Sequence, residues 1–275
     1  MGNVVELKTH EIMNDAELGT LGFIGWGPFG KRLQAVSQGQ KFRNTPVFCI
    51  HPLTELPENA LLPGTRVEWN LDQLFSQCKL IFMDSTFLEF KPLLTRIRLL
   101  IADRHILVLL KNDVSFARMT QEINPHKMVQ CVSNHPVNPQ DSVIALTGSE
   151  LVDREDMNQV RQCLSMFSFI QEVHTEYQLD TLERIFHLGA LTGSVLIEAL
   201  TDGGGALGLS REETAQAIIH VMHGMVKGLK QSENSPVLYK NSLLEETPRA
   251  AKSLLALEKS GFRGVLMEAV EPRKN

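Results

Sequence analysis

The feature that most constrains the fold is a glycine pattern near the start of the chain, directly after a short apolar segment. Residues 21–25 read LGFIG, and the residues that follow are Trp26, Gly27, Pro28, Phe29 and Gly30. The spacing of Gly25, Gly27 and Gly30 permits a tight turn, a close approach of pyrophosphate to the backbone and close packing of a strand against a helix. Because the N–H groups at the start of a helix attract phosphate, residues 25–30 predict a dinucleotide-binding turn.

Short apolar runs alternate with helical patterns through the first half of the chain. Each run is rich in Val, Ile, Leu or Phe, which is typical of strands that are covered on both faces. The runs occupy residues 21–25, 47–50, 80–83, 106–110, 128–133 and 143–146. Their alternation with helices predicts an α/β fold with a Rossmann-type doubly wound sheet whose strands are mostly parallel.

The second half of the chain changes character near residue 172, after which every apolar pattern has the helical period. A long helix is expected from about Leu179 to Leu200, ending at the glycine run 203–205. Further helices are expected to begin after Ser210 and after Thr247, which are both good N-cap residues. We therefore expect an N-terminal extension (1–19), a dinucleotide-binding Rossmann domain (20–172) and an all-α C-terminal domain (173–275).

The long expected helix also indicates how the chain assembles. It is apolar around much of its circumference, and it carries Gly189 and Gly193 four residues apart, so a neighbouring backbone can approach closely on that side. An exposed apolar strip of this length would exceed what soluble monomers usually tolerate. The pattern predicts a homodimer that is built through the C-terminal helices.

Charge and composition limit the classes of partner. The net charge is -5 and the Lys and Arg residues are scattered, so nothing in the sequence favours nucleic acid, and a small-molecule substrate is expected. The start of the chain lacks a basic patch followed by an apolar stretch, and no uninterrupted apolar run approaches the ~18 residues that span a bilayer. We therefore expect a cytoplasmic protein that makes no membrane contact.

The cysteines and histidines do not have the spacing of a metal site. No C-x-x-C pair occurs, and the cysteines stand singly among apolar neighbours at Cys49, Cys78, Cys131 and Cys163. We expect buried thiols in a reducing compartment. His220 and His223 lie three residues apart on an expected helix but lack a fixed third ligand, so no metal site is predicted.

The ends of the other predicted strands supply further candidates for cofactor binding. A typical NAD site has an acidic residue after the second strand, where it binds the ribose hydroxyls, but this chain has His51 and Pro52 there. The missing acid disfavours a strict NAD preference, so we expect NADP or NAD and slightly favour NADP, although His51 fits equally well as a polar strand-end residue. Ser85, Lys111 and Asn112 follow the next two strands, where doubly wound folds bind ligands.

The pattern of residues 20–271 resembles the pyrroline-5-carboxylate reductase family. The resemblance rests on GFIGWGPFG (22–30), on Asn134-His135-Pro136 where the family has Asn-Thr-Pro, and on IEALTDGGGALGLSREE (197–213) and LLALEKSGFRGVLMEAVE (254–271). It implies a Rossmann domain followed by a helical dimerisation domain, and hydride transfer from a nicotinamide to the C=N carbon of a small cyclic imino acid, which forms proline. It also implies that Asn134 lies near the nicotinamide; the alternative is a turn residue before Pro136.

Three segments depart from the family's pattern, and one of them is the turn at residues 84–87 (DSTF), where the family has Ala-Val-Lys-Pro after the third strand. Residues 186–192 (FHLGALT) align with the family's Ser-Gly-Ser-Gly-Pro-Ala-Tyr segment and retain only its second Gly, as Gly189. The substrate loop of the family, Thr-Ser-Pro-Gly-Gly-Thr-Thr, aligns with residues 244–250 (LEETPRA), where no position matches. Glu246, Thr247 and Arg249 are the substrate candidates there, and no catalytic residue is transferred. We expect an NAD(P)-dependent reductase of altered specificity; the alternative is a family member that binds the cofactor, has lost catalysis and serves regulation or assembly.

Overall fold

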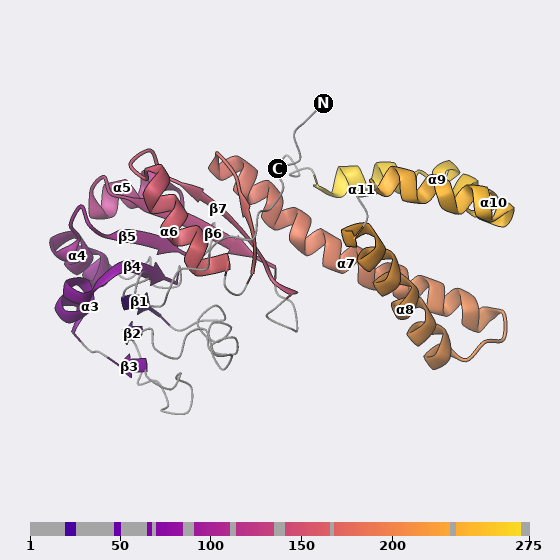
Figure 1. Cartoon of the computed structure of the whole chain (residues 1–275), viewed down its shortest axis with the longest axis horizontal. Coiled ribbons are helices and arrows are strands. Elements are labelled where there is room, and N and C mark those ends of the chain that lie inside the picture. The colour runs from indigo at the N-terminus through magenta and orange to yellow at the C-terminus, as the bar shows by residue number, and fades with distance from the viewer. Residues whose placement is uncertain are drawn as a thin grey trace. The chain divides into compact units, whose positions relative to one another are not determined.

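The computed structural model of the chain has a sheet-containing N-terminal part and a helical C-terminal part (Figure 1). It describes residues 20–25, 47–50, 65–67, 70–84, 91–110, 114–134, 141–165, 168–231 and 235–270. The chain divides into two compact units, residues 1–183 and residues 184–275. This division falls within a long helix, and the sequence-based domain limits at residues 19 and 172 stay predictions.

The described residues of the N-terminal unit form one sheet of eight strands in the order β3-β2-β1-β4-β5-β6-β7-β8. All neighbouring strands are parallel except β6 and β7, which are antiparallel. The strands that the sequence predicted are β1 (Thr20–Ile24), β2 (Val47–Ile50), β4 (Cys78–Met83), β5 (Ile106–Leu109), β6 (Met128–Ser133) and β7 (Val143–Gly148). The two edge strands, β3 (Thr65–Val67) and β8 (Phe169–Glu172), were not predicted. The predicted fold class, a doubly wound Rossmann-type sheet followed by helices, is confirmed.

Alternate residues of the central strands enter two buried clusters, one on each face of the sheet. Phe23, Phe82 and Val108 belong to the cluster that also contains residues of α6 (Arg154–Ser165). Ile24 and Met83 belong to the other cluster. That second cluster contains residues of α3 (Leu71–Gln77), α4 (Lys91–Leu100) and α5 (Phe116–Ile123). Burial on both faces explains why these strands are continuous apolar runs rather than alternating ones.

The cysteine side chains that the structure describes are buried free thiols at Cys78, Cys131 and Cys163. Burial raises the pKa of the Cys78 and Cys163 thiols to about 12, and it also raises the pKa of Cys131. Thiols of this kind stay protonated near neutral pH and are poor nucleophiles. The prediction of buried thiols is confirmed for these three residues; the side chain of Cys49 lies outside the described part of the chain.

A single helix, α7 (Glu176–Ala206), continues from the first unit into the second. It passes through residues 203–205, so the prediction that the glycine run ends this helix was wrong. The helix ends instead at Ala206, and Gly208, which has a φ of 89°, follows two residues later. The Gly208 N–H donates to the Gly205 carbonyl at 3.0 Å, and the Leu209 N–H donates to the Gly204 carbonyl at 3.1 Å, a Schellman pairing. The helices that follow are α8 (Arg211–Gln231), α9 (Pro236–Glu246), α10 (Pro248–Lys259) and α11 (Phe262–Val270).

Helix α7 is long and apolar enough to cross a membrane by length and composition alone, and it is the only such helix in the described residues. The sequence analysis expected no segment of this kind. Only 6% of its most apolar 18-residue window is buried within the chain. Length and composition are weak evidence for a membrane span, because a helix that packs against a second protein chain has the same properties.

Two buried histidines are hydrogen-bonded in series at the amino ends of β5 and β6. The Nδ1 atom of His105 accepts from the Ala102 N–H at 2.9 Å, so Nε2 carries the ring hydrogen and donates to the Phe75 carbonyl at 2.8 Å. Nε2 of His126 donates to the His105 carbonyl at 2.9 Å. Burial lowers the pKa of both imidazoles below the usual value of 6.5. Both rings are therefore neutral in the folded chain at neutral pH.

Acid is expected to destabilise the fold through these two rings. Because the pKa of His105 and His126 is lowered on folding, the unfolded chain binds more protons than the folded chain below about pH 6.5. Above pH 7 the contribution of these rings to the free energy of unfolding should not change with pH. As the pH drops from 6.5 toward 5, the free energy of unfolding should fall. Urea unfolding followed by circular dichroism across this range measures the effect.

The variant His126→Gln keeps an N–H donor toward His105 but cannot take up a proton, so its unfolding free energy should depend less on pH. His220→Gln, a change of an exposed histidine on α8, is the control and should retain the wild-type dependence. A dependence that is equally steep in His126→Gln and in the wild type would contradict this assignment.

Candidate functional site

The carboxyl end of β1 lies at the point where the winding of the sheet reverses direction. β1 has β2 on one side and β4 on the other, and the chain proceeds outward from this pair in both directions. The Asp84 N–H donates to the Ile24 carbonyl at 3.0 Å, which extends the pairing of these two strands to their carboxyl ends. Doubly wound folds bind ligands in the crevice outside the strands at such a reversal. The carboxyl edge beside β1 is therefore the candidate dinucleotide site.

Gly25 is the residue of the predicted dinucleotide turn that the structure describes. It is buried directly after β1 and has a φ of 89°, a conformation that favours glycine because other residues place Cβ against the backbone. The remaining cofactor-binding candidates lie outside the described residues: Trp26, Gly27, Pro28, Phe29, Gly30, His51, Ser85, Lys111 and Asn112. In the sequence these residues follow the strands β1, β2, β4 and β5, and their roles stay predictions.

Asn134 follows β6 and closes the connection from β6 to β7. Its Oδ1 atom accepts from the Val143 N–H at 2.7 Å, and its own N–H donates to the Val143 carbonyl at 3.3 Å. The side-chain oxygen of Asn134 is thus bound to the first residue of β7, and residues 135–140 lie outside the described part of the chain. A contact of Asn134 with a nicotinamide stays a prediction.

The substrate candidates Glu246, Thr247 and Arg249 lie where α9 ends and α10 begins. Glu246 is the last residue of α9, and Thr247 is the residue between the two helices. The Thr247 N–H donates to the Leu243 carbonyl at 3.1 Å, while its hydroxyl makes no capping hydrogen bond to α10. The Thr247 and Arg249 side chains are exposed. The structure thus brings these three residues together at one helix junction of the second unit.

A polar contact that sequence reasoning missed joins β6, α5 and the first turn of α7. The carboxylate oxygen Oε1 of Glu176 accepts from the Phe116 N–H at 2.8 Å and from Nε2 of Gln130 at 2.9 Å. Nε2 of Gln130 also donates to the Val114 carbonyl at 2.6 Å. The local signal was the single Gln within the apolar strand sequence MVQCVS. This contact lies at the carboxyl edge of the sheet, where β5 ends and α5 begins.

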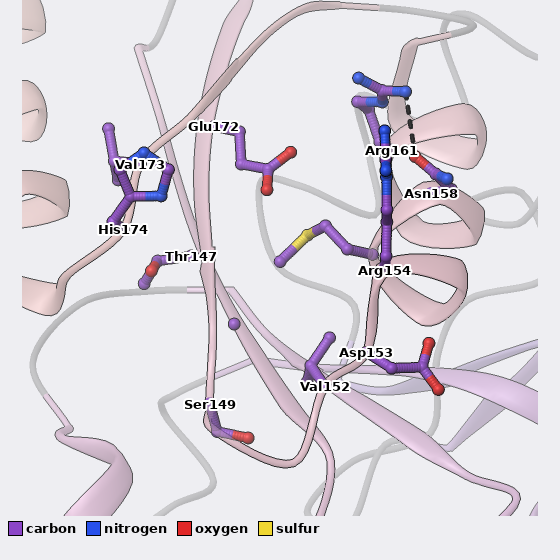
Figure 2. Close-up of a pocket in the computed structure, with 12 residues that line it drawn as sticks. Thr147, Ser149, Val152, Asp153, Arg154, Asn158, Arg161, Glu172, Val173 and His174 are labelled. Atoms are coloured by element: carbon purple, nitrogen blue, oxygen red, sulfur yellow. Dashed lines mark hydrogen bonds between the residues drawn. The ribbon is translucent and has the colours of Figure 1, made fainter.

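A cavity of about 510 Å³ lies elsewhere in the N-terminal unit, between α6 and the ends of β7 and β8. Figure 2 shows Arg154 and Arg161 on α6, Glu172 and His174 on the segment of β8, and the 3.0 Å hydrogen bond from Arg161 to Asn158. Because β7 is antiparallel to β6, its end pairs with the start of β6, so the cavity lies at the opposite edge of the sheet from Gly25. We do not assign the dinucleotide to this cavity.

The family model described as pyrroline-5-carboxylate reductase dimerisation matches residues 188–274. A pyrroline-5-carboxylate reductase of Synechocystis is 24% identical over 169 residues, which cover 62% of this chain and 63% of that protein. Pyrroline-5-carboxylate reductase 2 of Homo sapiens is 28% identical over 198 residues, which cover 68% of this chain and 61% of that protein. The matched regions thus span less than two thirds of the length of these relatives.

A solved structure extends the similarity to most of the chain at the level of the fold. The crystal structure of a Plasmodium falciparum pyrroline carboxylate reductase with NADP bound superposes with a TM-score of 0.71. The superposition covers 92% of this chain and 94% of that chain, with 22% sequence identity.

Across the residues that the structure describes, no cluster of three or more His, Cys, Asp or Glu side chains is arranged to hold a metal.

Replacing Gly25 with alanine is expected to destabilise the protein by about 1 to 2 kcal/mol, because a Cβ is unfavourable at positive φ. Urea unfolding without ligand measures this change. Gly264→Ala is the matched control, since Gly264 lies in α11 and a Cβ there meets nothing within 4 Å. Alanine in a helix is favoured over glycine by up to about 1 kcal/mol, so the control should be neutral or stabilising. Equal stability of Gly25→Ala and the wild type would contradict the argument.

Proposed function

We propose that this chain, which belongs to the pyrroline-5-carboxylate reductase family as a divergent member, is an NAD(P)-dependent reductase that acts on the C=N bond of a small cyclic imino acid. The observation that carries the proposal is the buried Gly25 with positive φ at the carboxyl end of β1. Together with Gly27 and Gly30 of the sequence, it has the spacing that a dinucleotide pyrophosphate requires. The residues present at this edge therefore fit a nicotinamide dinucleotide.

The roles of the chain in this reaction are binding and orientation. Residues 25–30 would bind the pyrophosphate through backbone N–H groups, and Lys111 and Asn112 follow β5 at the same edge of the sheet. The bound nicotinamide would supply the hydride. The sheet contributes by fixing the strand ends, because correct placement of the two reactants provides a large part of the rate enhancement in such transfers.

NADP is the favoured cofactor within this proposal. The sequence has His51 and Pro52 after β2, where NAD-specific sites usually have an acidic residue that binds the ribose hydroxyls. The absence of a carboxylate there removes the repulsion that a 2′-phosphate would otherwise meet. The similar Plasmodium structure also has NADP bound, which supports the same choice.

We propose that the substrate differs from pyrroline-5-carboxylate. The family's hydroxyl-rich and glycine-rich loop aligns with Leu244 to Ala250, and this segment contains Glu245 and Glu246. Two carboxylates in this position would repel the carboxylate of the usual substrate. Arg249 is the one cation in the segment, and its side chain is exposed. It would bind the anionic group of a substrate that approaches from another direction. A small acid with a differently placed carboxylate fits this segment better.

The second candidate function is regulation or assembly without catalysis. It is favoured by one observation, the loss of every family residue in the substrate loop at positions 244–250. Under this alternative the dinucleotide would bind at Gly25 with normal affinity but would not be oxidised with any imine. Binding and turnover measured on the same preparation therefore distinguish the two functions.

We further propose that the chain forms a homodimer through its C-terminal helices. Large apolar side chains are exposed along α7 and α8, among them Leu191, Val195, Leu200, Ile219, Val221 and Val226. Gly189 and Gly193 have no atom within 4 Å of an added Cβ, so one side of α7 is open to a second backbone. The family model that matches this region is a dimerisation model, which supports a second copy of the chain as the partner.

The wild-type protein is expected to bind NADPH and to oxidise it with at least one cyclic imino acid, with lower kcat/KM for pyrroline-5-carboxylate than for the best substrate of the panel. Gly27→Asp should abolish both binding and turnover, because it introduces a negative charge beside the pyrophosphate. Isothermal titration calorimetry and NADPH absorbance at a fixed imine concentration measure the two effects.

Arg161→Ala is the control for this experiment, because Arg161 lines the cavity at the opposite edge of the sheet. Its NADPH affinity should equal that of the wild type. Absence of NADPH and NADH binding in the wild type would refute the reductase proposal, and binding without turnover would favour the second candidate. Turnover of pyrroline-5-carboxylate above every other substrate would refute the altered specificity.

Light scattering is expected to give the wild type a mass twice the chain mass of 30.8 kDa. Gly193→Glu should remove this species and give aggregated or unfolded protein, because a charged side chain would be buried between the two copies. Ala102→Glu, on an exposed turn of the first unit, should remain dimeric. A well-folded wild-type monomer at micromolar concentration would disprove the dimer.

A further inference from the structure

The carboxylate of Glu176 holds together three elements that are distant in the sequence. Glu176 is the first residue of α7, Phe116 is the first residue of α5 and Gln130 is the third residue of β6. One oxygen of the carboxylate accepts the Phe116 N–H at 2.8 Å and the Gln130 amide at 2.9 Å. Both donors lie in the first unit, at the edge of the sheet where β5 ends.

The contact with Phe116 satisfies a group that the helix itself cannot satisfy. The first N–H groups of a helix have no partner within it, and Ser115 supplies a partner for the Arg118 N–H at 3.2 Å. Glu176 supplies the partner for the Phe116 N–H. A carboxylate at this position is also attracted by the positive end of the helix dipole. Helix α5 is therefore capped jointly by a local residue and by a residue 60 positions further along the chain.

The contact with Gln130 is the reason for a polar side chain in a buried apolar strand. Gln130 is fully buried on the face of β6 that carries α5, next to Val129 and Cys131. Its Nε2 atom donates to both Val114 and Glu176, while its Oε1 atom has no partner among the described residues. Burying an amide with one end unsatisfied is unfavourable. The hydrogen bonds to Val114 and Glu176 are thus the favourable interactions that offset the burial of the Gln130 amide.

We propose that Glu176 is a positioning residue that fixes the amino end of α7 to the amino end of α5 and to β6. Helix α7 runs without interruption from residue 176 to residue 206, and it carries the chain from the first unit into the second. A contact of the first turn fixes the start of this helix on the first unit. The catalytic consequence rests on the proposed function: the contact lies at the edge proposed for the nicotinamide, so loss of Glu176 lowers kcat and spares dinucleotide binding.

Hydrogen exchange tests the contact independently of any activity. In Glu176→Ala, the amide of Phe116 and the hydrogen-bonded amides of residues 178–183 should exchange roughly tenfold faster or more, because a charge-assisted hydrogen bond is lost. Glu176→Gln retains an oxygen acceptor without the charge and should show an intermediate rate. Glu183→Ala is the matched control, since Glu183 lies two turns further along α7 and its side chain makes no hydrogen bond or ion pair within the described residues. Wild-type exchange rates in Glu176→Ala would overturn the proposal.

Steady-state kinetics test the catalytic consequence. Relative to Glu183→Ala, the variant Glu176→Ala should lose roughly tenfold in kcat with its NADPH Kd changed by less than about twofold, and Glu176→Gln should recover part of the loss. Unchanged kcat in an active enzyme with faster exchange would overturn the catalytic role of Glu176. If the wild type turns over no imine, the reductase proposal fails, and the exchange rates alone still decide whether Glu176 fixes α7.

Discussion

The pairing of β1 with β4 is the interaction on which the rest of the structure depends. Phe23 of β1 and Phe82 of β4 occupy matching positions in the register, and their rings stack with centroids 5.0 Å apart. With β2 on the other side of β1, successive strands are added outward in both directions from this pair. The carboxyl ends of β1 and β4 therefore border the crevice where a ligand can enter. The location of the candidate site follows from backbone pairing and core packing before any side chain contacts a ligand.

The central strands could be predicted because strands that are buried on both faces have nearly continuous apolar sequences. β5 and residues 80–83 of β4 are uninterrupted apolar runs, and their shortness favours strands over buried helices. The edge strands do not have such sequences. β3 reads TRV and β8 reads FIQE, with the side chain of Phe169 55% exposed, so neither shows an apolar excess. Their pairing depends on neighbouring strands that are distant in the sequence.

The candidate site was predictable only where one local segment determines it. Gly25 could be identified because the spacing of glycines around a single turn carries the information. The contact of Glu176 with Gln130 joins residues 46 positions apart, and neither residue belongs to a motif. Asn134 illustrates the intermediate case, since its position in the sequence indicated a polar role but only the structure shows its side-chain oxygen bound to the Val143 N–H. Contacts between distant segments require the fold to be known first.

The glycine run at the end of α7 makes that end of the helix weak on its own. Glycine in a helix costs about 1 kcal/mol relative to alanine, so residues 203–205 have little intrinsic helical stability. At Gly204 a larger residue would be obstructed, because a Cβ would lie 2.7 Å from Cγ2 of Thr214 on α8. The same close approach that requires glycine also supplies the packing that keeps this segment helical. We therefore expect the end of α7 and the start of α8 to open and close as one cooperative unit, separately from the first turn of α7, which Glu176 fixes to α5 and β6.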